Sequence, residues 1–258
     1  MNRLWQRIYY LTPSILKRFF PRHYVHVLRW LGSFRSWYYR GDKVYCPCCE
    51  HSFRRFLQFK NRDGAQCPRC FSLERHRILW MFLIQKTGIL SGKLVLLHFA
   101  PEYSMQNNFR KLPYVRYVNA DLSSPLAMVK MDIMRIGFRE NSFDAILCVH
   151  VLTLVSNDLK ALQELYRVLK PGGWAIILSP VCAGKLNTVT PRFISLGELS
   201  GQGRKAFFTP RIYGSDYADI LVQAGFKVKE TDFVQEFSSQ EISRFGFKED
   251  EKIFFCTK

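Results

Sequence analysis

The sequence predicts an α/β protein with a doubly wound sheet and a small metal-binding module in front of it. From residue 94 onward, short β-rich runs alternate with helical patterns, which is typical of a sheet with helices on both faces. Two Cys-x-x-Cys pairs precede this region, and a strongly basic segment precedes the cysteines. We therefore expect three parts: a basic helical segment at 1–40, a metal-binding module at 41–75 and the sheet domain at 76–258.

Length and charge limit the class of protein. The 258 residues can form one α/β core of ordinary size, with about a quarter of the chain left over. The formal net charge of +17 is unevenly placed, because residues 1–90 hold 17 Lys/Arg against 4 Asp/Glu. A basic region of this size attracts polyanions such as RNA, acidic lipid headgroups or phosphorylated substrates.

The predicted cellular compartment follows from the absence of two hydrophobic patterns, a membrane-spanning run and a signal peptide. No apolar run approaches the ~20 residues that a membrane-spanning helix needs, and the N-terminus has no signal peptide pattern. We expect a cytoplasmic protein, either soluble or attached peripherally to a membrane. In the cytoplasm the eight cysteines are better interpreted as metal ligands or buried thiols than as disulfides.

The basic segment at 1–40 contains no acidic residue and has the periodicity of two amphipathic helices. Pro21 separates a first stretch, with apolar positions from Leu4 to Phe19, from a second stretch at 24–38. Either their apolar stripes pack on the following domain, or they lie in the interface of an acidic membrane surface. Both interpretations stay open, because the same periodicity serves either role.

The sheet domain begins with a predicted strand at 94–99. A proline followed by two glycines at 171–173 closes a predicted helix, because proline stops a helix and glycine permits a tight reversal. Further strands are predicted at 114–119, 145–151, 174–179, 226–233 and 252–257, and helices at 157–170 and 216–225.

Four cysteines have the spacing of a structural zinc site. Cys46 with Cys49 and Cys67 with Cys70 form two Cys-x-x-Cys pairs separated by 17 residues. Such pairs place four thiolates at tetrahedral corners around one Zn²⁺. The shell is then closed and leaves no position for chemistry, so the predicted role of the metal is structural.

The remaining cysteines and one histidine are alternatives by residue type. Cys48 could replace Cys49 as a ligand, although Cys-x-Cys spacing is less usual, and we expect Cys49. His51 is expected at the surface because four thiolates complete the shell. Three further cysteines lie in or beside predicted strands and are expected to be core thiols: Cys148, Cys182 and Cys256.

Two runs in the sheet domain carry a family resemblance. They are Asn-Ser-Phe-Asp-Ala-Ile-Leu-Cys-Val-His at 141–150 and Glu-Leu-Tyr-Arg-Val-Leu-Lys-Pro-Gly-Gly-Trp at 164–174. With them the chain resembles the class I S-adenosylmethionine-dependent methyltransferase superfamily, of the methyltransferase type 11 kind. The run Cys-Pro-Arg-Cys-Phe-Ser-Leu-Glu-Arg-His-Arg at 67–77 is similar to a bacterial group with an N-terminal four-cysteine zinc ribbon. The resemblance implies a Rossmann-like, seven-stranded methyltransferase sheet.

The resemblance also implies where S-adenosyl-L-methionine binds. Asp121, followed by Leu122, ends the second strand where an acid accepts both ribose hydroxyls. Asp132 occupies the position that accepts the adenine amine, and the aliphatic Ile133 beside it covers the ring. Cys148 lies beside the reactive methyl group. Either aspartate alone would be a cap or turn residue, but their order and spacing together favour the cofactor.

The first loop departs from the family pattern. Members place an acid and then Gly-x-Gly here, whereas this chain has His98-Phe99-Ala100-Pro101-Glu102. We still expect Phe99, Ala100, Pro101 and Glu102 to contact the cofactor, because S-adenosylmethionine has no pyrophosphate that requires a glycine cradle. Glu102 is expected to reach the amino group of the cofactor, with a surface turn as the alternative.

The catalytic residues follow from the chemistry of methyl transfer. Transfer from a sulfonium is an in-line displacement, in which alignment supplies up to ~7–11 kcal/mol in model systems. A hydroxyl acceptor also needs a general base, and His150 is our candidate, with a structural role as the alternative. Tyr213, together with Tyr217, is expected to position the substrate.

Three hypotheses describe the function. We favour methyl transfer to a small-molecule, sugar or glycan-related acceptor, because the turn after the 145–151 strand lacks the motifs of nucleic-acid amino and cytosine C5 methyltransferases. The first alternative is an RNA methyltransferase, and the second is a non-catalytic binding module with the same fold. For the RNA alternative, the phosphate contacts would be Arg54, Arg55, Arg62, Arg69, Arg75 and Arg77.

Overall fold

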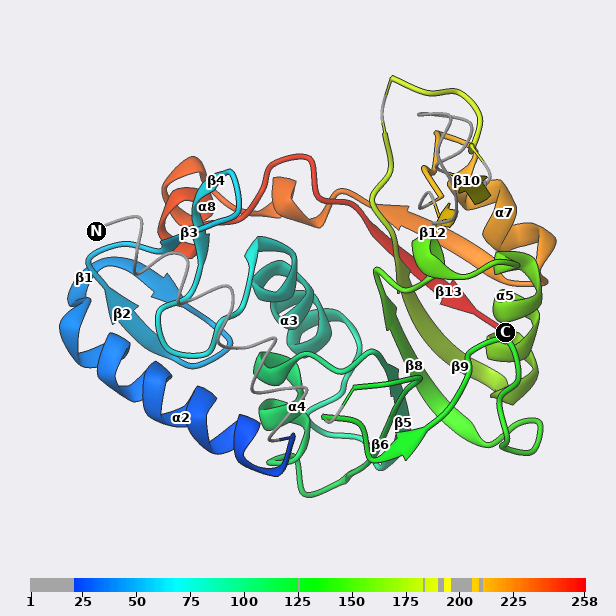
Figure 1. Ribbon diagram of the computed structural model, residues 1–258, viewed down its shortest axis with the longest axis horizontal. Helices are drawn as coiled ribbons and strands as arrows, with labels where there is room; N and C mark the ends of the chain where they lie inside the picture. Colours follow the sequence, from blue (N-terminus) through cyan, green and yellow to red (C-terminus); the bar gives the residue numbers. More distant parts are fainter. Residues whose placement is uncertain (1–20, 125, 183, 190–192, 196–205, 209–210) are drawn as a thin grey trace.

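The computed structural model describes residues 21–124, 126–182, 184–189, 193–195, 206–208 and 211–258 (Figure 1). Of the two predicted N-terminal helices, the second is confirmed as α2 (Pro21–Tyr38), and the first lies outside the described residues. Within the described ranges, no helix combines the length and the apolar character that a membrane crossing requires.

A seven-stranded sheet forms the centre of the protein (Figure 1). Its strand order is β12-β13-β9-β8-β5-β6-β7, and β5 (Leu94–Phe99) lies where the order reverses, between β6 and β8. Strands β5 to β9 are parallel, whereas β13 runs antiparallel to both of its neighbours. The other strands are β6 (Val115–Asp121), β7 (Val129–Lys130), β8 (Phe143–Val149), β9 (Leu169–Leu178), β12 (Lys227–Thr231) and β13 (Ile253–Thr257).

Helices cover both faces of this sheet. In Figure 1, α3 and α4 lie on one side of the sheet, and α5 and α7 lie on the other. This arrangement confirms the predicted doubly wound α/β class. The helices on the two faces are α3 (Glu74–Lys86), α4 (Tyr103–Phe109), α5 (Asp158–Val168) and α7 (Tyr217–Gln223). The 3₁₀ turns are η1 (Leu152–Leu154) and η2 (Phe233–Glu236).

One predicted boundary is wrong, and its error has a local cause. The Pro-Gly-Gly run at 171–173 is not a reversal between a helix and a strand, because β9 already begins at Leu169, which pairs with Phe143. The pairing shifts register after this point, as in a β-bulge, and Gly172 takes φ 75°. A Cβ at Gly173 would lie 2.9 Å from the Asp144 carbonyl, so only glycine allows the strands to approach here.

The front of the chain forms two antiparallel hairpins beside the sheet domain (Figure 1). The short helix α8 (Ser239–Phe245), which comes near the end of the sequence, lies against β1, with the rings of Phe245 and Tyr45 6.1 Å apart. The boundary that we expect at residue 75 falls inside α3, which continues from the hairpins into the sheet domain. The hairpins are β1 (Arg40–Cys46) with β2 (His51–Phe53), and β3 (Leu57–Phe59) with β4 (Arg62–Gln66).

Helix α2 packs on this front module. A Cβ at Gly32 would lie 2.2 Å from the carbonyl oxygen of Arg69, so the helix backbone touches the second cysteine pair. On the same side Leu28 is buried, and the Arg35 guanidinium lies 5.0 Å from the centroid of the Phe71 ring. Of the two interpretations left open for this segment, packing on the sheet domain is corrected for α2, because its small and buried positions face the cysteine module. Contact with a membrane surface stays a prediction.

Arg77 connects the module to the rest of the protein. Its side chain is fully buried, and Nη1 donates to the carbonyls of Ala65 at 2.9 Å and Ser72 at 3.2 Å. Nε donates to the carbonyl of Phe245 at 2.6 Å, and Nη2 donates to that of Gly246. One guanidinium therefore holds the hairpins, α3 and the end of α8 together.

Gly246 is required at this junction. It ends α8 in the left-handed conformation with φ 61°, which glycine adopts without steric cost. A Cβ would lie 2.7 Å from the Phe56 ring and 2.8 Å from Nη2 of Arg77. The glycine thus lets the chain pass close enough for its carbonyl to accept from Arg77.

We predict that Arg77→Met lowers the free energy of unfolding by about 3 kcal/mol or more, because buried carbonyls lose their donors. Urea denaturation followed by circular dichroism measures this change. The exposed Arg116 offers the matched control, and Arg116→Met should stay within about 0.5 kcal/mol of the wild type. Equal losses in the two variants would contradict this assignment.

Candidate functional site

The four predicted zinc ligands come together. The Sγ atoms of Cys46, Cys49, Cys67 and Cys70 all lie within 4.8 Å of one another, with Cys46 to Cys70 at 3.6 Å and Cys49 to Cys67 at 3.7 Å. Burial acts to raise the pKa of Cys46, but hydrogen bonds from the neighbouring thiols outweigh it and hold that pKa well below its ordinary value. The pKa values of Cys49 and Cys70 are instead raised, so in the metal-free cluster the thiolate form is favoured at Cys46 but not at these two sulfurs. Thiolate is the form that binds metal, so a bound ion would have to displace their protons.

Both cysteine pairs use the same backbone turn. Glu50 N donates to the Cys46 carbonyl at 2.8 Å, and Phe71 N donates to the Cys67 carbonyl at 3.2 Å. Glu50 has φ 56° and Phe71 has φ 62°, so each turn ends in a left-handed residue with a side chain. Such a residue costs roughly 1–2 kcal/mol, which the surrounding contacts have to offset.

The other cysteines and His51 take different positions. The Cys48 thiol donates to the carbonyl of His76 at 3.5 Å and lies outside the four-sulfur group. His51 is exposed, and its Nδ1 lies 2.5 Å from the Cys49 carbonyl oxygen. Cys256 is buried as predicted, which raises its pKa to about 12. Cys182 is exposed, a correction to its expected place in the core, because it lies in the loop after β9.

The first loop after β5 adopts the sharp bend that glycine usually provides. Ala100 has φ 52°, and its N–H donates to the Ala120 carbonyl at 2.9 Å. Phe99 and Pro101 are buried, and Glu102 is the residue before α4. Alanine therefore occupies a left-handed position here, at a cost of roughly 1–2 kcal/mol.

Two histidines hold the Glu102 carboxylate. Nε2 of His98 lies 3.0 Å from Oε2, and Nε2 of His76 lies 3.3 Å from Oε1. The N–H of Leu73 donates to Nδ1 of His76, so the proton of the neutral ring is on Nε2, which lies close to the carboxylate without a hydrogen bond among the described residues. Burial acts to raise the pKa of Glu102, but the two histidines lower it well below the ordinary value. Glu102 is therefore an ionised, internally held side chain and not a surface turn residue.

Asp121 ends β6 with one carboxylate oxygen engaged. Oδ1 accepts from Ser123 N at 2.7 Å and from Ser124 N at 2.6 Å, as in a turn. Across the described part of the chain, no hydrogen bond to Oδ2 is formed. The next residue, Leu122, is 62% exposed, so an apolar side chain stands in solvent beside this free oxygen.

Asp132 repeats this arrangement in the neighbouring loop. Its Oδ1 accepts from Met134 N at 2.9 Å, while Oδ2 has no donor within the described ranges. Ile133 is buried beside it. The N–H of Met131 donates to the Asp121 carbonyl at 3.1 Å, which holds the two aspartate loops side by side. Order and spacing in the sequence thus correspond to adjacency in space.

His150 follows β8 in a left-handed conformation. Its φ is 57°, and its N–H donates to the Leu178 carbonyl at 2.8 Å, which continues the pairing with β9. The imidazole is half-buried, and burial followed by the charge of Arg75 lowers its pKa to about 4. The ring is therefore neutral at pH 7 and able to accept a proton. Cys148, two residues earlier, is fully buried in the sheet, so its side chain does not reach solvent.

The two predicted substrate-positioning tyrosines lie in the core. Tyr213 is fully buried, and its hydroxyl donates to Oδ2 of Asp158 at 3.0 Å. The Tyr217 hydroxyl donates to the Ile177 carbonyl at 3.1 Å, and the two rings lie 4.6 Å apart. Arg211 completes the group with a 3.1 Å ion pair to Asp158. Both hydroxyls therefore already have acceptors, and a role for Tyr213 in substrate positioning stays a prediction.

Arg75 is a site candidate that sequence reasoning placed only among RNA contacts. It lies in the first turn of α3, and its Nε is buried without a hydrogen-bond partner. Burial lowers its pKa, although Glu102 and Glu251 oppose this. Its positive charge also lowers the pKa of His150, which follows β8. No pattern in the sequence distinguishes this arginine from its neighbours.

The arginines proposed as RNA contacts are only partly available. The prediction that Arg77 contacts RNA phosphates is wrong, because its side chain is fully buried. Nη1 of Arg62 donates to both carboxylate oxygens of Glu74 at 3.1 Å. Arg54 and Arg55 are exposed and lie over the rings of Tyr38 and Tyr39, respectively. The basic front of the chain is therefore less open to phosphate groups than its composition suggests.

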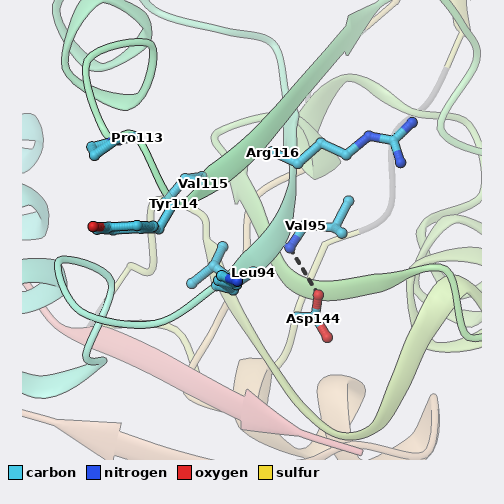
Figure 2. Close-up of a pocket in the computed structure, with 8 residues that line it drawn as sticks. Leu94, Val95, Pro113, Tyr114, Val115, Arg116 and Asp144 are labelled. Atoms are coloured by element: carbon cyan, nitrogen blue, oxygen red, sulfur yellow. Dashed lines mark hydrogen bonds between the residues drawn. The ribbon is translucent and has the colours of Figure 1, made fainter.

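A pocket of about 370 Å³ lies at the opposite end of the sheet, where β5, β6 and β8 begin (Figure 2). Asp144 in its wall accepts from Val95 N at 2.8 Å and pairs with Lys170 at 2.7 Å. Ligands of open α/β sheets bind at the carboxyl ends of the strands, where Asp121 and His150 lie. This pocket is therefore separate from the candidate cofactor site.

Comparison with known proteins finds a family match in the centre of the chain. Residues 94–177 match the family model described as a methyltransferase domain. The chain is 32% identical over 112 residues to the sterol 24-C-methyltransferase of Kluyveromyces lactis, covering 42% of this chain and 29% of that protein. It is 35% identical over 63 residues to a ubiquinone/menaquinone biosynthesis C-methyltransferase of Coxiella burnetii, covering 24% of this chain and 25% of that protein. The chain thus spans less than a third of the length of these relatives.

Among solved structures, the [4+2]-cyclase SpnF is similar, with a TM-score of 0.50 and 16% identity. The match covers 79% of this chain and 87% of that structure. At this identity the likeness shows the fold alone. Because one fold supports different chemistries, the function has to be argued from the residues of the site.

Proposed function

Because residues 94–177 match the model of a methyltransferase domain, we propose that the chain is a class I S-adenosylmethionine-dependent methyltransferase that transfers a methyl group from this cofactor to a small-molecule acceptor. One observation carries the proposal: Asp121 and Asp132 lie in adjacent loops at the carboxyl end of the sheet, and each keeps one carboxylate oxygen free of hydrogen bonds from the described residues. The acceptor class includes sugars and glycan-related compounds. The sterol and quinone-pathway relatives support a small-molecule acceptor without identifying it.

The free carboxylate oxygens fit the polar groups of the cofactor. Oδ2 of Asp121 would accept from the ribose hydroxyls, and Oδ2 of Asp132 would accept from the adenine amine. Leu122 and Ile133 would cover the faces of the adenine ring, which would remove the exposed Leu122 side chain from water. When bound, the cofactor supplies an electrophilic methyl group on a sulfonium.

Arg75 is our candidate for the carboxylate of the cofactor's methionine part. Arg75 is half-buried, and its buried Nε has no hydrogen-bond partner among the described residues, so a bound anion would supply the missing acceptor. Glu102 cannot take this role because its own charge would repel a carboxylate. Since the two histidines already hold Glu102, we assign it the support of the first loop and leave direct contact with the cofactor's amino group as a prediction.

His150 would act on the acceptor. It lies at the end of β8, next to the expected position of the methyl group, and its neutral ring can accept a proton from an acceptor hydroxyl. The left-handed backbone at His150 turns the chain away from the sheet at this residue. The remaining rate would come from alignment of the acceptor with the methyl group.

We predict that the zinc-loaded protein binds S-adenosylmethionine in isothermal titration calorimetry and that Asp121→Ala raises the Kd about 10- to 100-fold, since a charged hydrogen bond is lost. Arg75→Gln should raise it about tenfold for the same reason. Asp219 is exposed on α7, and Asp219→Ala is the matched control that should bind like the wild type. If the folded wild type binds no cofactor, the chain is a non-catalytic binding module and the proposal fails.

The pH dependence of kcat/KM tests His150. Because its pKa is lowered to about 4, the basic form persists as the pH falls, and kcat/KM should decline only near pH 4 and not near the ordinary histidine value of about 6.5. His150→Gln should lower kcat about 10²- to 10⁴-fold and remove this decline. Assays at pH 7 after exposure to each pH control for unfolding. An unchanged rate in His150→Gln would assign this histidine a structural role.

We also propose that the four-cysteine cluster holds one structural Zn²⁺. Four sulfurs within 4.8 Å of one another match the donor set of a closed tetrahedral site. The ion would join the two hairpins, whose short strands bury little surface by themselves.

Metal analysis of the purified protein should therefore find about one zinc per chain. Cys67→Ser should lose this zinc and lower the Tm, because metal binding contributes directly to the stability of such small modules. Cys182→Ser, at an exposed cysteine outside the cluster, should keep both the zinc and the wild-type Tm. Full zinc content in Cys67→Ser would contradict the assignment.

A further inference from the structure

One face of α2 exposes large aromatic side chains. Trp30 is 67% exposed, Phe34 55%, Trp37 73% and Tyr38 56%, and we call these four residues the aromatic stripe. Trp30, Phe34 and Trp37 follow helical spacing. The ring centroids of Trp30 and Phe34 lie 6.2 Å apart, and those of Phe34 and Trp37 lie 6.3 Å apart. A soluble helix usually turns such residues inward, so their gathering on the outer face requires an explanation.

Packing of the opposite face decides this orientation. Leu28 is buried, and Gly32 touches the backbone of the second cysteine pair. The helix is therefore fixed on the cysteine module through its small and aliphatic positions. It runs along the outer edge of the molecule (Figure 1). Its aromatic side chains are exposed to solvent.

Basic residues accompany the stripe. The sequence of α2 holds three arginines and no Asp or Glu. Arg29 on α2, Arg40 at the start of β1 and Arg54 after β2 are exposed, and the Arg54 guanidinium lies 5.7 Å from the Tyr38 ring. A partner for this surface has to offer an apolar layer that takes up the aromatic side chains and negatively charged groups beside it.

We propose that the aromatic stripe docks the protein on an anionic phospholipid surface. Tryptophan and tyrosine favour the boundary between headgroups and acyl chains, and arginines beside them attract acidic headgroups. A second copy is disfavoured, because two such surfaces would bring like charges together. The inference does not rest on the proposed methyl transfer, since it concerns a surface outside the sheet domain.

Vesicle sedimentation of the full-length protein tests this proposal. The protein should sediment with vesicles that contain phosphatidylglycerol, much less with phosphatidylcholine alone, and less as salt is raised. Trp30→Ser with Trp37→Ser should weaken the binding at least about tenfold, and Arg29→Gln with Arg40→Gln should weaken it on the anionic vesicles only.

Two matched variants serve as controls. Tyr114 is also 56% exposed but lies at the far end of the sheet, and Lys229 is an exposed cation on β12. Tyr114→Ser and Lys229→Gln should bind vesicles like the wild type, and all variants should keep the wild-type circular dichroism spectrum.

Three results would overturn the proposal. If the wild type does not bind vesicles, or if the double tryptophan variant binds them as well as the wild type does, the stripe does not contact lipid. Light scattering that finds a dimer, converted to a monomer by the same variant, would assign the stripe to a second copy. Retention of RNA on filters that depends on the two tryptophans, without vesicle binding, would assign it to nucleic acid.

Discussion

A single buried guanidinium, that of Arg77, joins three parts of this protein that are distant in sequence. A charge without access to water is tolerated only when hydrogen bonds replace its hydration, and here four main-chain carbonyls do so. Two of these belong to the cysteine module and two to the end of α8. Their positions are therefore coupled, because moving either segment would leave a cation and its acceptors unpaired. The α8 segment reaches the module only because Gly246 permits the close approach.

The first turn of α3 extends this junction toward the candidate site. Arg75, His76 and Arg77 are consecutive, and on a helix consecutive side chains point in different directions. Arg77 donates to the module, His76 lies against Glu102 in the first loop, and the charge of Arg75 acts on His150 after β8. A structural metal that orders the cysteine pairs would thereby also order the start of α3. This gives the module a physical connection to the first loop after β5.

The first loop illustrates how an unusual sequence can keep the geometry of its fold. Family members use an acid and glycines at this point, whereas this chain uses His98, Ala100 and Glu102. The left-handed bend is retained at Ala100, and the carboxylate of Glu102 is held from both sides by imidazoles. Strain in the backbone is thus offset by a buried ionic network that ties the loop to β5 and α3. No spacing rule in the sequence predicts that network, because His76 and Glu102 are brought together only by packing.

The sequence by itself determined six of the seven strands of the central sheet, the four cysteines and the two aspartates, because hydrophobic period and fixed spacing are local properties. It did not indicate the two-residue β7 or the short hairpin strands. Strand ends agree within two residues except at β9, where a bulge depends on its partner strand. Tertiary structure alone decided which polar groups lost their water. The sequence does not distinguish Arg75 and Arg77 from the other arginines near them. Only their different burial makes Arg77 a structural cation, Arg75 a candidate anion contact and the exposed arginines surface charges. Tertiary packing likewise decided that Tyr213 is buried in the core. It also decided which face of α2 is exposed, because the opposite face packs on the cysteine module.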